Sequence, residues 1–404
     1  MTDPRSPSPS ACLLGHATHP DAHMALALAA AQVEARRATL RRFVPTLGWL
    51  YLSERLMPQA EAVLAEAQQR WPGVTWVGAA VAGLCATGVE YLHEPALALM
   101  LTDVPPAHFR TFHGRQPLDA TRDWGAALVH ADPALPDLPE LVEELAERVG
   151  GVGLFGGLVS HRGRPAQWAG EAVEGGLSGV AFTPALRWIT RLSQGCWPVG
   201  EPFTVTATDG PMVLALDDEP ALDVLLAEAG GGVIQAHQTP DPALIQRLRQ
   251  VFVAVAPAHH AMLDPGGSLN ADTHVRPLIG IDPGRRAMAL ADLVEPGQQL
   301  CFCRRDPQAA RRDLVRLCTE IREEVEGNGE DSDVPTPAAR LLGAIYVSCL
   351  GRGGAHFGGP SAELAIVRQA LGDVPLIGFF AGGEIAGPQL HSHSGVLSVL
   401  VSAE

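Results

Sequence analysis

Apolar residues near the start of the chain occur in two kinds of pattern, continuous runs and helical spacing. Residues 47–53 (LGWLYLS) form a short and nearly continuous apolar run, which is typical of a buried strand. Residues 59–70 place apolar side chains at helical spacing, and residues 74–81 are a second apolar run. This order of segments predicts a strand–helix–strand unit.

The middle of the chain follows a different pattern. Residues 151–216 contain short apolar segments separated by Gly, Pro and Asp, and residues 203–208 (FTVTAT) alternate as an antiparallel strand does. Further helices are predicted over residues 21–42, 138–149, 220–229 and 307–325. Together these elements predict a mixed α/β fold of two domains, each made of mixed sheets flanked by helices.

The strand–helix–strand pattern returns near the end of the chain. The segment LYLS at 50–53 matches IYVS at 345–348, and Gly83 matches Gly383 at an offset of 300 residues. We therefore predict an internal βαβ repeat between the two chain ends. Because ligands of such sheets bind at the carboxyl ends of strands, the residues that end these two strands are candidate ligand contacts.

Composition and charge narrow the classes of function. The 404 residues suffice for two or three domains, and all 29 basic residues are Arg because the sequence contains no Lys. The absence of Lys excludes Schiff-base, pyridoxal-phosphate, P-loop and protein-kinase chemistry. A formal net charge of -16 disfavours binding to phosphates of nucleic acids, so we expect no nucleic-acid partner.

The cysteines and the N-terminal segment bear on the compartment. Seven scattered cysteines, an odd number, indicate reduced thiols in a cytoplasmic protein. Residues 1–20 are expected to form a disordered tail, and the first ten lack the basic and apolar regions of a secretory signal. The longest apolar stretch, residues 78–89, is shorter than the roughly 20 residues of a membrane helix. We therefore expect a cytoplasmic protein without a membrane partner.

Two short motifs have structural explanations. GVGLFG at 151–156 fits the dinucleotide-binding fingerprint, but a predicted helix precedes it and a strand follows, which is the reverse of the order that fingerprint needs. A glycine cap of the preceding helix explains it better. Cys301 and Cys303 lie on one face of a strand, where core packing is favoured over a metal site because further ligands are missing.

A candidate ligand pair stands near the end of the chain. Arg352 follows the strand 345–348, and Glu384 lies in a glycine-rich apolar turn. A guanidinium for a carboxylate and a carboxylate for an amine complement an amino acid, although the same two groups could form a structural ion pair. Ser348 or Cys349 could be nucleophiles, but no activating base is visible, so we expect no catalytic residue and no enzyme.

The residues of this region resemble the C-terminal signature of the FIST family of bacterial sensory proteins. The matching segments are CLGRG at 349–353, PLIGFF at 375–380 and GEI at 383–385, with Glu363 on the helix between the first two. The first half is similar to the N-terminal domain of that family at residues 50–53, 76–83 and 195–200. The resemblance spans about residues 45–390 and implies a FIST N-like domain over 21–220 and a FIST C-like domain over 221–404.

The resemblance implies a cytoplasmic sensory protein that binds a small polar metabolite such as an amino acid. Its signal would pass to a separate partner, which in this family is a kinase, a chemoreceptor or a cyclic-dinucleotide enzyme. Reading the residues and the resemblance together, we expect the ligand to contact Ser53, Ser348, Cys349, Arg352, Gly383 and Glu384.

A second hypothesis follows from relatives that bind haem. In that case the protein is a haem-binding nitric oxide sensor that acts through a partner kinase or cyclic-dinucleotide enzyme. The histidines kept as candidate haem ligands are His93, His391 and His393. Otherwise we expect no cofactor and no metal site.

Overall fold

The computed structural model describes residues 11–402 except residues 120, 160–165, 230–241, 249, 264–268, 270–272 and 327–339. The first half of the predicted tail, residues 1–10, therefore lies outside the described residues. From Cys12 onward the chain differs from the expected disordered tail, because β1 (Cys12–Thr18) pairs along its whole length with β6 (Ala96–Thr102).

The chain forms two compact units that are not consecutive halves. The first consists of Met1–Ser193 and Leu314–Glu404, and the second, Gln194–Asp313, is inserted into it. The predicted domain boundary at residue 220 falls inside this inserted segment. The difference arises because β13 (Arg187–Ser193) pairs with β25 (Gly395–Val401), so segments on both sides of the insertion belong to one sheet.

Three six-stranded sheets make up the first unit. The first sheet has the order β1, β6, β2 (Leu47–Ser53), β3 (Thr75–Val81), β10 (Ala166–Ala169) and β11 (Ala172–Glu174). The second has the order β7 (Phe109–His113), β12 (Leu177–Phe182), β8 (Ala126–Ala131), β9 (Leu154–Leu158), β23 (Glu384–Ala386) and β24 (Gln389–His391). The third has the order β13, β25, β21 (Leu341–Cys349), β22 (Leu376–Ala381), β4 (Gly83–Ala86) and β5 (Val89–Leu92).

The same arrangement of strands occurs in all three sheets. Each has a central parallel pair, namely β2 with β3, β8 with β9, and β21 with β22. The helix that connects each pair is α2 (Ala60–Arg70), α3 (Leu138–Arg148) or α7 (Ala362–Leu371). The first strand of each pair also borders an antiparallel strand, β6, β12 or β25, which in turn borders β1, β7 or β13.

Each sheet is completed by a hairpin from another part of the chain. The hairpin β4–β5 follows β3 in sequence but pairs with β22, the hairpin β10–β11 follows β9 but pairs with β3, and the hairpin β23–β24 follows β22 but pairs with β9. The three strand–helix–strand units therefore exchange hairpins in a cycle. This exchange ties the three sheets together.

A glycine marks the same position in each parallel pair. Gly78 in β3, Gly156 in β9 and Gly378 in β22 press against the carbonyl oxygen of the neighbouring strand, where a Cβ atom would overlap that oxygen. The carbonyl belongs to Leu50, Val129 or Tyr346, respectively. These glycines mark equivalent positions, so residues of the three strand–helix–strand units can be compared by their distance from the glycine.

Alignment through these glycines shifts the predicted sequence match between the two chain ends by one residue. Leu50, not Tyr51, corresponds to Tyr346. A shift of one residue turns a strand side chain to the other face of the sheet. Tyr51 accordingly packs in the core between the sheets, whereas the Tyr346 hydroxyl reaches Glu363 on α7. Although the strand order is shared, an internal repeat of the sequence stays a prediction.

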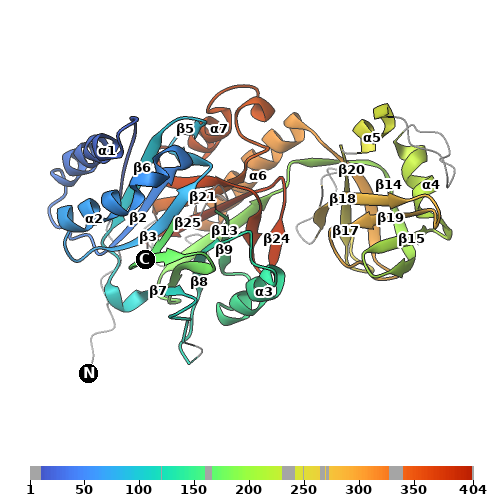
Figure 1. Cartoon of the computed structure of the whole chain (residues 1–404), viewed down its shortest axis with the longest axis horizontal. Helices are drawn as coiled ribbons and strands as arrows, with labels where there is room; N and C mark the ends of the chain where they lie inside the picture. Colours follow the sequence, from blue (N-terminus) through green and yellow to red (C-terminus); the bar gives the residue numbers. More distant parts are fainter. Residues whose placement is uncertain are drawn as a thin grey trace. The chain divides into compact units, whose positions relative to one another are not determined.

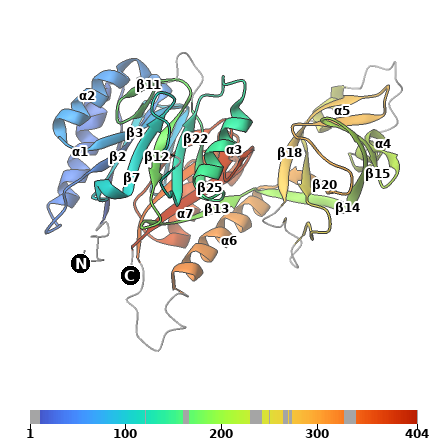
Figure 2. The ribbon, with the colours of Figure 1, turned by 90° about the horizontal axis from the view of Figure 1, so that it is seen from below.

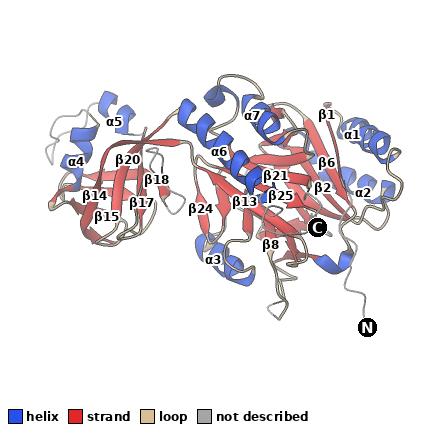
Figure 3. Ribbon diagram, turned by 180° about the vertical axis from the view of Figure 1, so that it is seen from behind, coloured by secondary structure: helices blue, strands red, loops and turns tan. Residues whose placement is uncertain are grey.

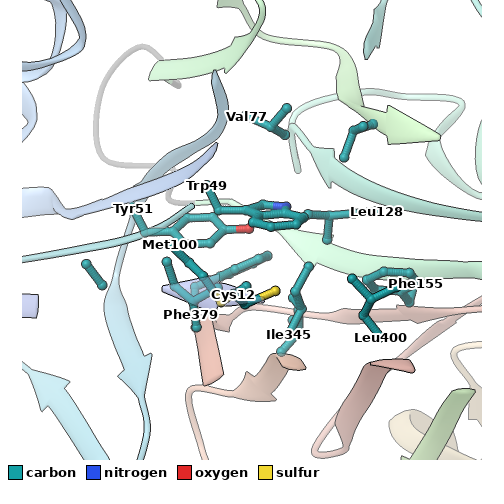
Figure 4. Close-up of a cluster of buried hydrophobic side chains, with 14 of the residues drawn as sticks. Cys12, Trp49, Tyr51, Val77, Met100, Leu128, Phe155, Ile345, Phe379 and Leu400 are labelled. Atoms are coloured by element: carbon teal, nitrogen blue, oxygen red, sulfur yellow. The ribbon is translucent and has the colours of Figure 1, made fainter. Parts of the chain in front are cut away.

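The inner faces of the three sheets share one apolar core. Figure 4 shows how side chains from all three sheets gather there, among them Trp49 of β2, Leu128 of β8 and Ile345 of β21. Near its centre Tyr51 Oη and His130 Nε2 lie 2.8 Å apart, and Phe379 of β22 packs against both rings. All three sheets therefore contribute side chains to a single core.

Helices cover the outer faces of the sheets in the first unit (Figures 1 and 3). In Figure 2, α1 (Ala22–Arg37) and α2 lie side by side over the first sheet. Their apolar side chains form a second core with the outer face of that sheet. Short 3₁₀ helices precede α2, β7 and α7, namely η1 (Glu54–Gln59), η2 (Pro106–His108) and η4 (Gly354–Phe357).

The second unit is built around a closed antiparallel sheet. Its strand order is β14 (Cys196–Asp209), β20 (Gln299–Arg305), β17 (Val251–Ala256), β18 (His274–Asp282), β19 (Ala287–Leu290), β15 (Met212–Leu216) and β16 (Glu219–Pro220). Because β14 also pairs with β15, the sheet closes into a barrel. The helices α4 (Ala221–Glu228) and α5 (Pro242–Leu248) contribute to its apolar core, and α6 (Pro307–Glu326) leads back to the first unit.

The mixed α/β class is confirmed, and most predicted elements occur where expected. The strand at 47–53 has the predicted bounds, and the helices at 138–149 and 307–325 differ from α3 and α6 by one residue. The GVGLFG segment follows α3 and leads into β9, as the helix-cap explanation requires. Within the described chain, no helix is both long and apolar enough to cross a membrane.

Candidate functional site

Arg352, the predicted ligand guanidinium, lies in a buried network after β21. Its Nε donates to Glu363 Oε1 at 3.0 Å, and its Nη1 and Nη2 donate to the carbonyl and hydroxyl oxygens of Ser193 at 2.9 and 3.0 Å. The guanidinium also lies over the Phe357 ring, 5.2 Å from its centroid. Only 1% of Arg352 is exposed, so the protein itself surrounds the group.

Glu363, on the first turn of α7, is the carboxylate partner of Arg352. It is fully buried and also accepts hydrogen bonds from Ser348 Oγ at 3.0 Å and from Tyr346 Oη at 2.7 Å. The ion-pair partner predicted from the sequence is Glu384, and the structure places Glu363 there instead. The signal available in the sequence was a carboxylate within an apolar helix, since such a group is seldom buried without a cation.

Glu384 begins β23 and is also fully buried. Its Oε2 accepts hydrogen bonds from the backbone N–H of Ser394 at 3.0 Å and from Ser394 Oγ at 2.7 Å, whereas Oε1 has no partner within the described residues. Burial raises the pKa of this carboxyl to about 8, against smaller opposing effects of Ser394, Arg352 and Cys349. Glu384 is therefore mostly protonated at neutral pH.

Cys349 ends β21 beside Glu384. Its Sγ lies 3.9 Å from His393 Nδ1, and its backbone N–H donates to the carbonyl of Ser394 at 2.9 Å. Burial raises the pKa of the Cys349 thiol to about 11, which disfavours the thiolate that a nucleophile needs. The carbonyl of Gly383 accepts a hydrogen bond from Leu158 N–H at 2.9 Å and so links β23 to β9.

The structure brings five of the six predicted ligand residues to the ends of β21 and β22. Ser348 and Arg352 share Glu363, Cys349 and Glu384 both contact Ser394, and Gly383 directly precedes Glu384. Ser53 belongs to the first sheet, where its Oγ accepts a hydrogen bond from Ala96 N–H at 2.9 Å. Among the residues described, no hydrogen bond connects it to the other five.

The three candidate haem ligands lie in the hairpin regions. His93 is exposed in the turn after β5, His391 is buried at the end of β24, and His393 is half-buried beside Cys349. His93 and His393 both have a positive φ, at 62° and 57°. The part of the chain that the structure describes contains no group of three or more His, Cys, Asp or Glu side chains able to hold a metal ion.

A cavity of about 950 Å³ opens between α2, the end of β7 and the hairpin β10–β11. Its walls are apolar in part, and they also carry Glu61, Glu174, Arg115, His113 and Gln167. The apolar lining includes Met57, Pro58, Leu64, Trp168, Ala172 and Val173. The volume lies within the range of roughly 300–1,000 Å³ found for small-molecule sites, with a few polar groups on apolar walls.

Polar contacts lie at the rim of this cavity. Glu171 in the hairpin turn accepts from Arg115 at 3.1 Å and lies 3.5 Å from His113 Nε2. Gln167 is buried, donates to the Gly176 carbonyl and accepts from Ser178 Oγ at 2.5 Å. No sequence pattern singles out these residues, because they come from segments that are distant in sequence and have no motif spacing.

Comparison with known proteins identifies the family. A sequence model of the FIST N domain matches residues 46–219, and one of the FIST C domain matches residues 222–387. The chain belongs to the FIST family. FIST domains are associated with sensory signal transduction and small-ligand binding. The predicted resemblance is thereby confirmed.

Mycobacterial proteins are similar to this FIST protein over nearly its whole length. The uncharacterized protein Rv0628c of Mycobacterium tuberculosis (strain ATCC 25618 / H37Rv) is 32% identical over 391 residues, which cover 92% of this chain and 94% of the relative. The uncharacterized protein Mb0898c of Mycobacterium bovis (strain ATCC BAA-935 / AF2122/97) is 28% identical over 391 residues, covering 92% and 93%. The similarity therefore extends across both FIST domains.

Proposed function

We propose that this FIST protein is a cytoplasmic sensor that binds a small polar metabolite, such as an amino acid, in the cavity beside α2. The observation that carries the proposal is the cavity of about 950 Å³ with charges of both signs on partly apolar walls. Ligand binding would change the surface presented to a separate signalling protein, a kinase, a chemoreceptor or a cyclic-dinucleotide enzyme.

The charges on the cavity wall suit a zwitterion. Arg115 can pair with a carboxylate, and Glu61 or Glu174 with an ammonium group. Trp168 and Leu64 supply apolar surface for the rest of the ligand. The wall thus offers charges of both signs, which an amino acid complements at both its ammonium and its carboxylate group.

Arg352 and Glu384, the ligand pair predicted from the sequence, are both buried, and this burial argues against a ligand site between them. The guanidinium already contacts Glu363 and Ser193, so a ligand would have to displace a buried ion pair to reach it. Displacing one partner of such a pair leaves an uncompensated buried charge, which costs about 3–5 kcal/mol. We propose that Arg352 stabilises the fold and that the ligand binds elsewhere.

The proposal is one of binding rather than catalysis. The high pKa of Cys349 disfavours a thiolate, and the Ser348 hydroxyl donates to Glu363, a carboxylate that Arg352 and Tyr346 also engage. Neither group therefore has the environment of an activated nucleophile.

Thermal-shift measurements with each amino acid, followed by native mass spectrometry, test the proposal. We expect the unfolding temperature to rise with at least one amino acid and the mass spectrum to show one ligand per chain. Arg115→Gln should weaken binding by about tenfold or more, because it removes the cation for the carboxylate. Arg70→Gln is the matched control, since Arg70 lies on α2 in an exposed pair with Glu66.

Two results would contradict the proposal. One is an unfolding temperature that no amino acid changes, and the other is equal binding by the Arg115→Gln variant. A purified protein that carries the mass and colour of haem would favour the haem hypothesis, in which His93, His391 or His393 is the ligand.

A further inference from the structure

The cavity is one of three equivalent junctions between a helix and a hairpin. In each sheet the hairpin borders the second strand of the parallel pair, and the connecting helix covers that pair. The hairpin positions can be compared through the glycines. Gly378 pairs with Cys85, Gly78 with Trp168 and Gly156 with Ile385. The residues opposite these in the hairpins are Glu90, Ala172 and Leu390.

Glu90 closes the junction of the third sheet. Its Oε1 accepts hydrogen bonds from the backbone N–H groups of Glu363 at 2.9 Å and Leu364 at 3.3 Å, in the first turn of α7. Its Oε2 accepts from Gly354 N–H at 2.9 Å. A carboxylate in this place satisfies donors that the start of a helix leaves without partners. The hairpin β4–β5 is thereby fastened to α7.

Leu390 closes the junction of the second sheet. It packs in an apolar cluster that includes Leu138 at the start of α3 and Ile385 in the same hairpin. This contact is apolar, whereas the contact that Glu90 makes in the third sheet is polar. In both cases one side chain of four or five heavy atoms, extending from the same hairpin position, fills the space beside the helix.

Ala172 occupies this position in the first sheet, and there the junction is open. Its methyl group lines the cavity together with Met57 and Leu64 from the segment of η1 and α2. Trp168, which is opposite Ala172 in the hairpin, lines it too, and its Nε1 has no hydrogen-bond partner within the described part of the chain. The hairpin therefore lacks the side chain that fastens the other two hairpins to their helices.

We propose that the ligand supplies the missing group: an apolar arm of about side-chain size fills the junction beside Ala172 and fastens the hairpin β10–β11 to α2. This inference rests on the proposed amino-acid binding in the same cavity. Met57, Leu64 and Trp168 make the junction apolar, and Glu61 in the first turn of α2 disfavours a second carboxylate there. The ligand is thus an amino acid with a large apolar side chain, and binding tightens the hairpin on the helix.

The substitution Ala172→Leu reproduces in this junction the side chain that fills the second one. We expect it to raise the unfolding temperature of the free protein and to weaken binding of leucine, methionine or phenylalanine by about tenfold or more. Ala62→Leu is the matched control, because Ala62 is exposed on α2 and does not line the cavity. The control should bind these amino acids as the unchanged protein does.

Hydrogen exchange of the unchanged protein tests the inference without a substitution. Backbone amides of residues 166–174 should exchange more slowly when leucine, methionine or phenylalanine is bound. If an amino acid binds but these amides exchange at the same rate, or if Ala172→Leu binds it equally well, the inference is wrong and the proposed function stands. If no amino acid binds the unchanged protein, the proposed function itself fails.

Discussion

Glu384 shows how its surroundings set the chemistry of a single residue. The carboxyl group is fully buried, and among the described residues only one of its oxygens has hydrogen-bond partners. Gln167 occupies the corresponding hairpin position in the first sheet, where its side-chain oxygen accepts from Ser178. A neutral amide at the corresponding position is consistent with a site that favours the uncharged form of Glu384.

We expect Glu384→Gln to reduce the pH dependence of stability. The folded protein holds this proton with a pKa of about 8, compared with an ordinary value of 4.5. The resulting contribution to stability is complete below pH 4.5 and is lost as pH rises through about 8. Thermal unfolding between pH 4.5 and 9 should therefore decline less steeply for the variant than for the unchanged protein.

Glu143→Gln, an exposed change on α3, serves as the control for this pH series. It removes the same formal charge and should leave the slope of the unchanged protein. Parallel pH curves for Glu384→Gln and the unchanged protein would show that Glu384 ionises normally in the fold.

At the scale of helices and strands, buried polar contacts connect elements that are distant in sequence. Arg352 follows β21, its carboxylate partner Glu363 lies on α7, and Ser193 ends β13. The same guanidinium therefore holds three elements that are distant in sequence. Arg352 and Ser193 are 159 residues apart, so no local pattern could have revealed the contact.

We expect Arg352→Met to lower the free energy of unfolding by about 3–5 kcal/mol, because Glu363 would remain buried without its cation. Urea denaturation measures this loss. Glu363→Gln should restore part of the stability when combined with Arg352→Met, since both charges are then removed. If Arg352→Met keeps full stability but loses the ligand-induced shift in unfolding temperature, the residue is a ligand contact, as the sequence analysis had proposed.

At the scale of the whole first unit, the three sheets share their central side chains. Phe379 lies 5.2 Å from Tyr51 and 5.6 Å from His130, measured between ring centroids, so residues of all three sheets meet there. Burial lowers the pKa of His130 to about 3, which keeps the imidazole neutral beside the Tyr51 hydroxyl. The core thus accepts a polar pair only in its uncharged form.

We expect Phe379→Ala to cost about 3–5 kcal/mol of unfolding free energy, as large-to-small changes in a packed core do. Because the core is shared, backbone hydrogen exchange should accelerate in all three sheets of the first unit together. Val44→Ala, at a side chain that is 73% exposed, is the control and should change neither quantity. Acceleration confined to the sheet of β22 would show that the sheets unfold separately.

The sequence by itself determined the local elements and the family. The apolar run at 47–53 and the helical spacing at 138–149 specify β2 and α3 almost to the residue, because burial pattern and chain geometry act over a few residues. The order of short motifs was enough to predict the FIST family. Ser348, Cys349, Arg352, Gly383 and Glu384 lie near one edge of the third sheet because they end or follow the adjacent parallel strands β21 and β22, and their role as ligand contacts stays a prediction.

Only the tertiary structure decided how these elements combine. The exchange of hairpins, the pairing of Arg352 with Glu363 and the insertion of residues 194–313 depend on contacts between distant segments. The cavity beside α2 is lined by Ala172, where the other two hairpins carry a glutamate and a leucine, and α2 is more than 100 residues earlier in the chain. A small side chain such as Ala172 indicates a binding site only when the fold shows that the space beside it is unfilled.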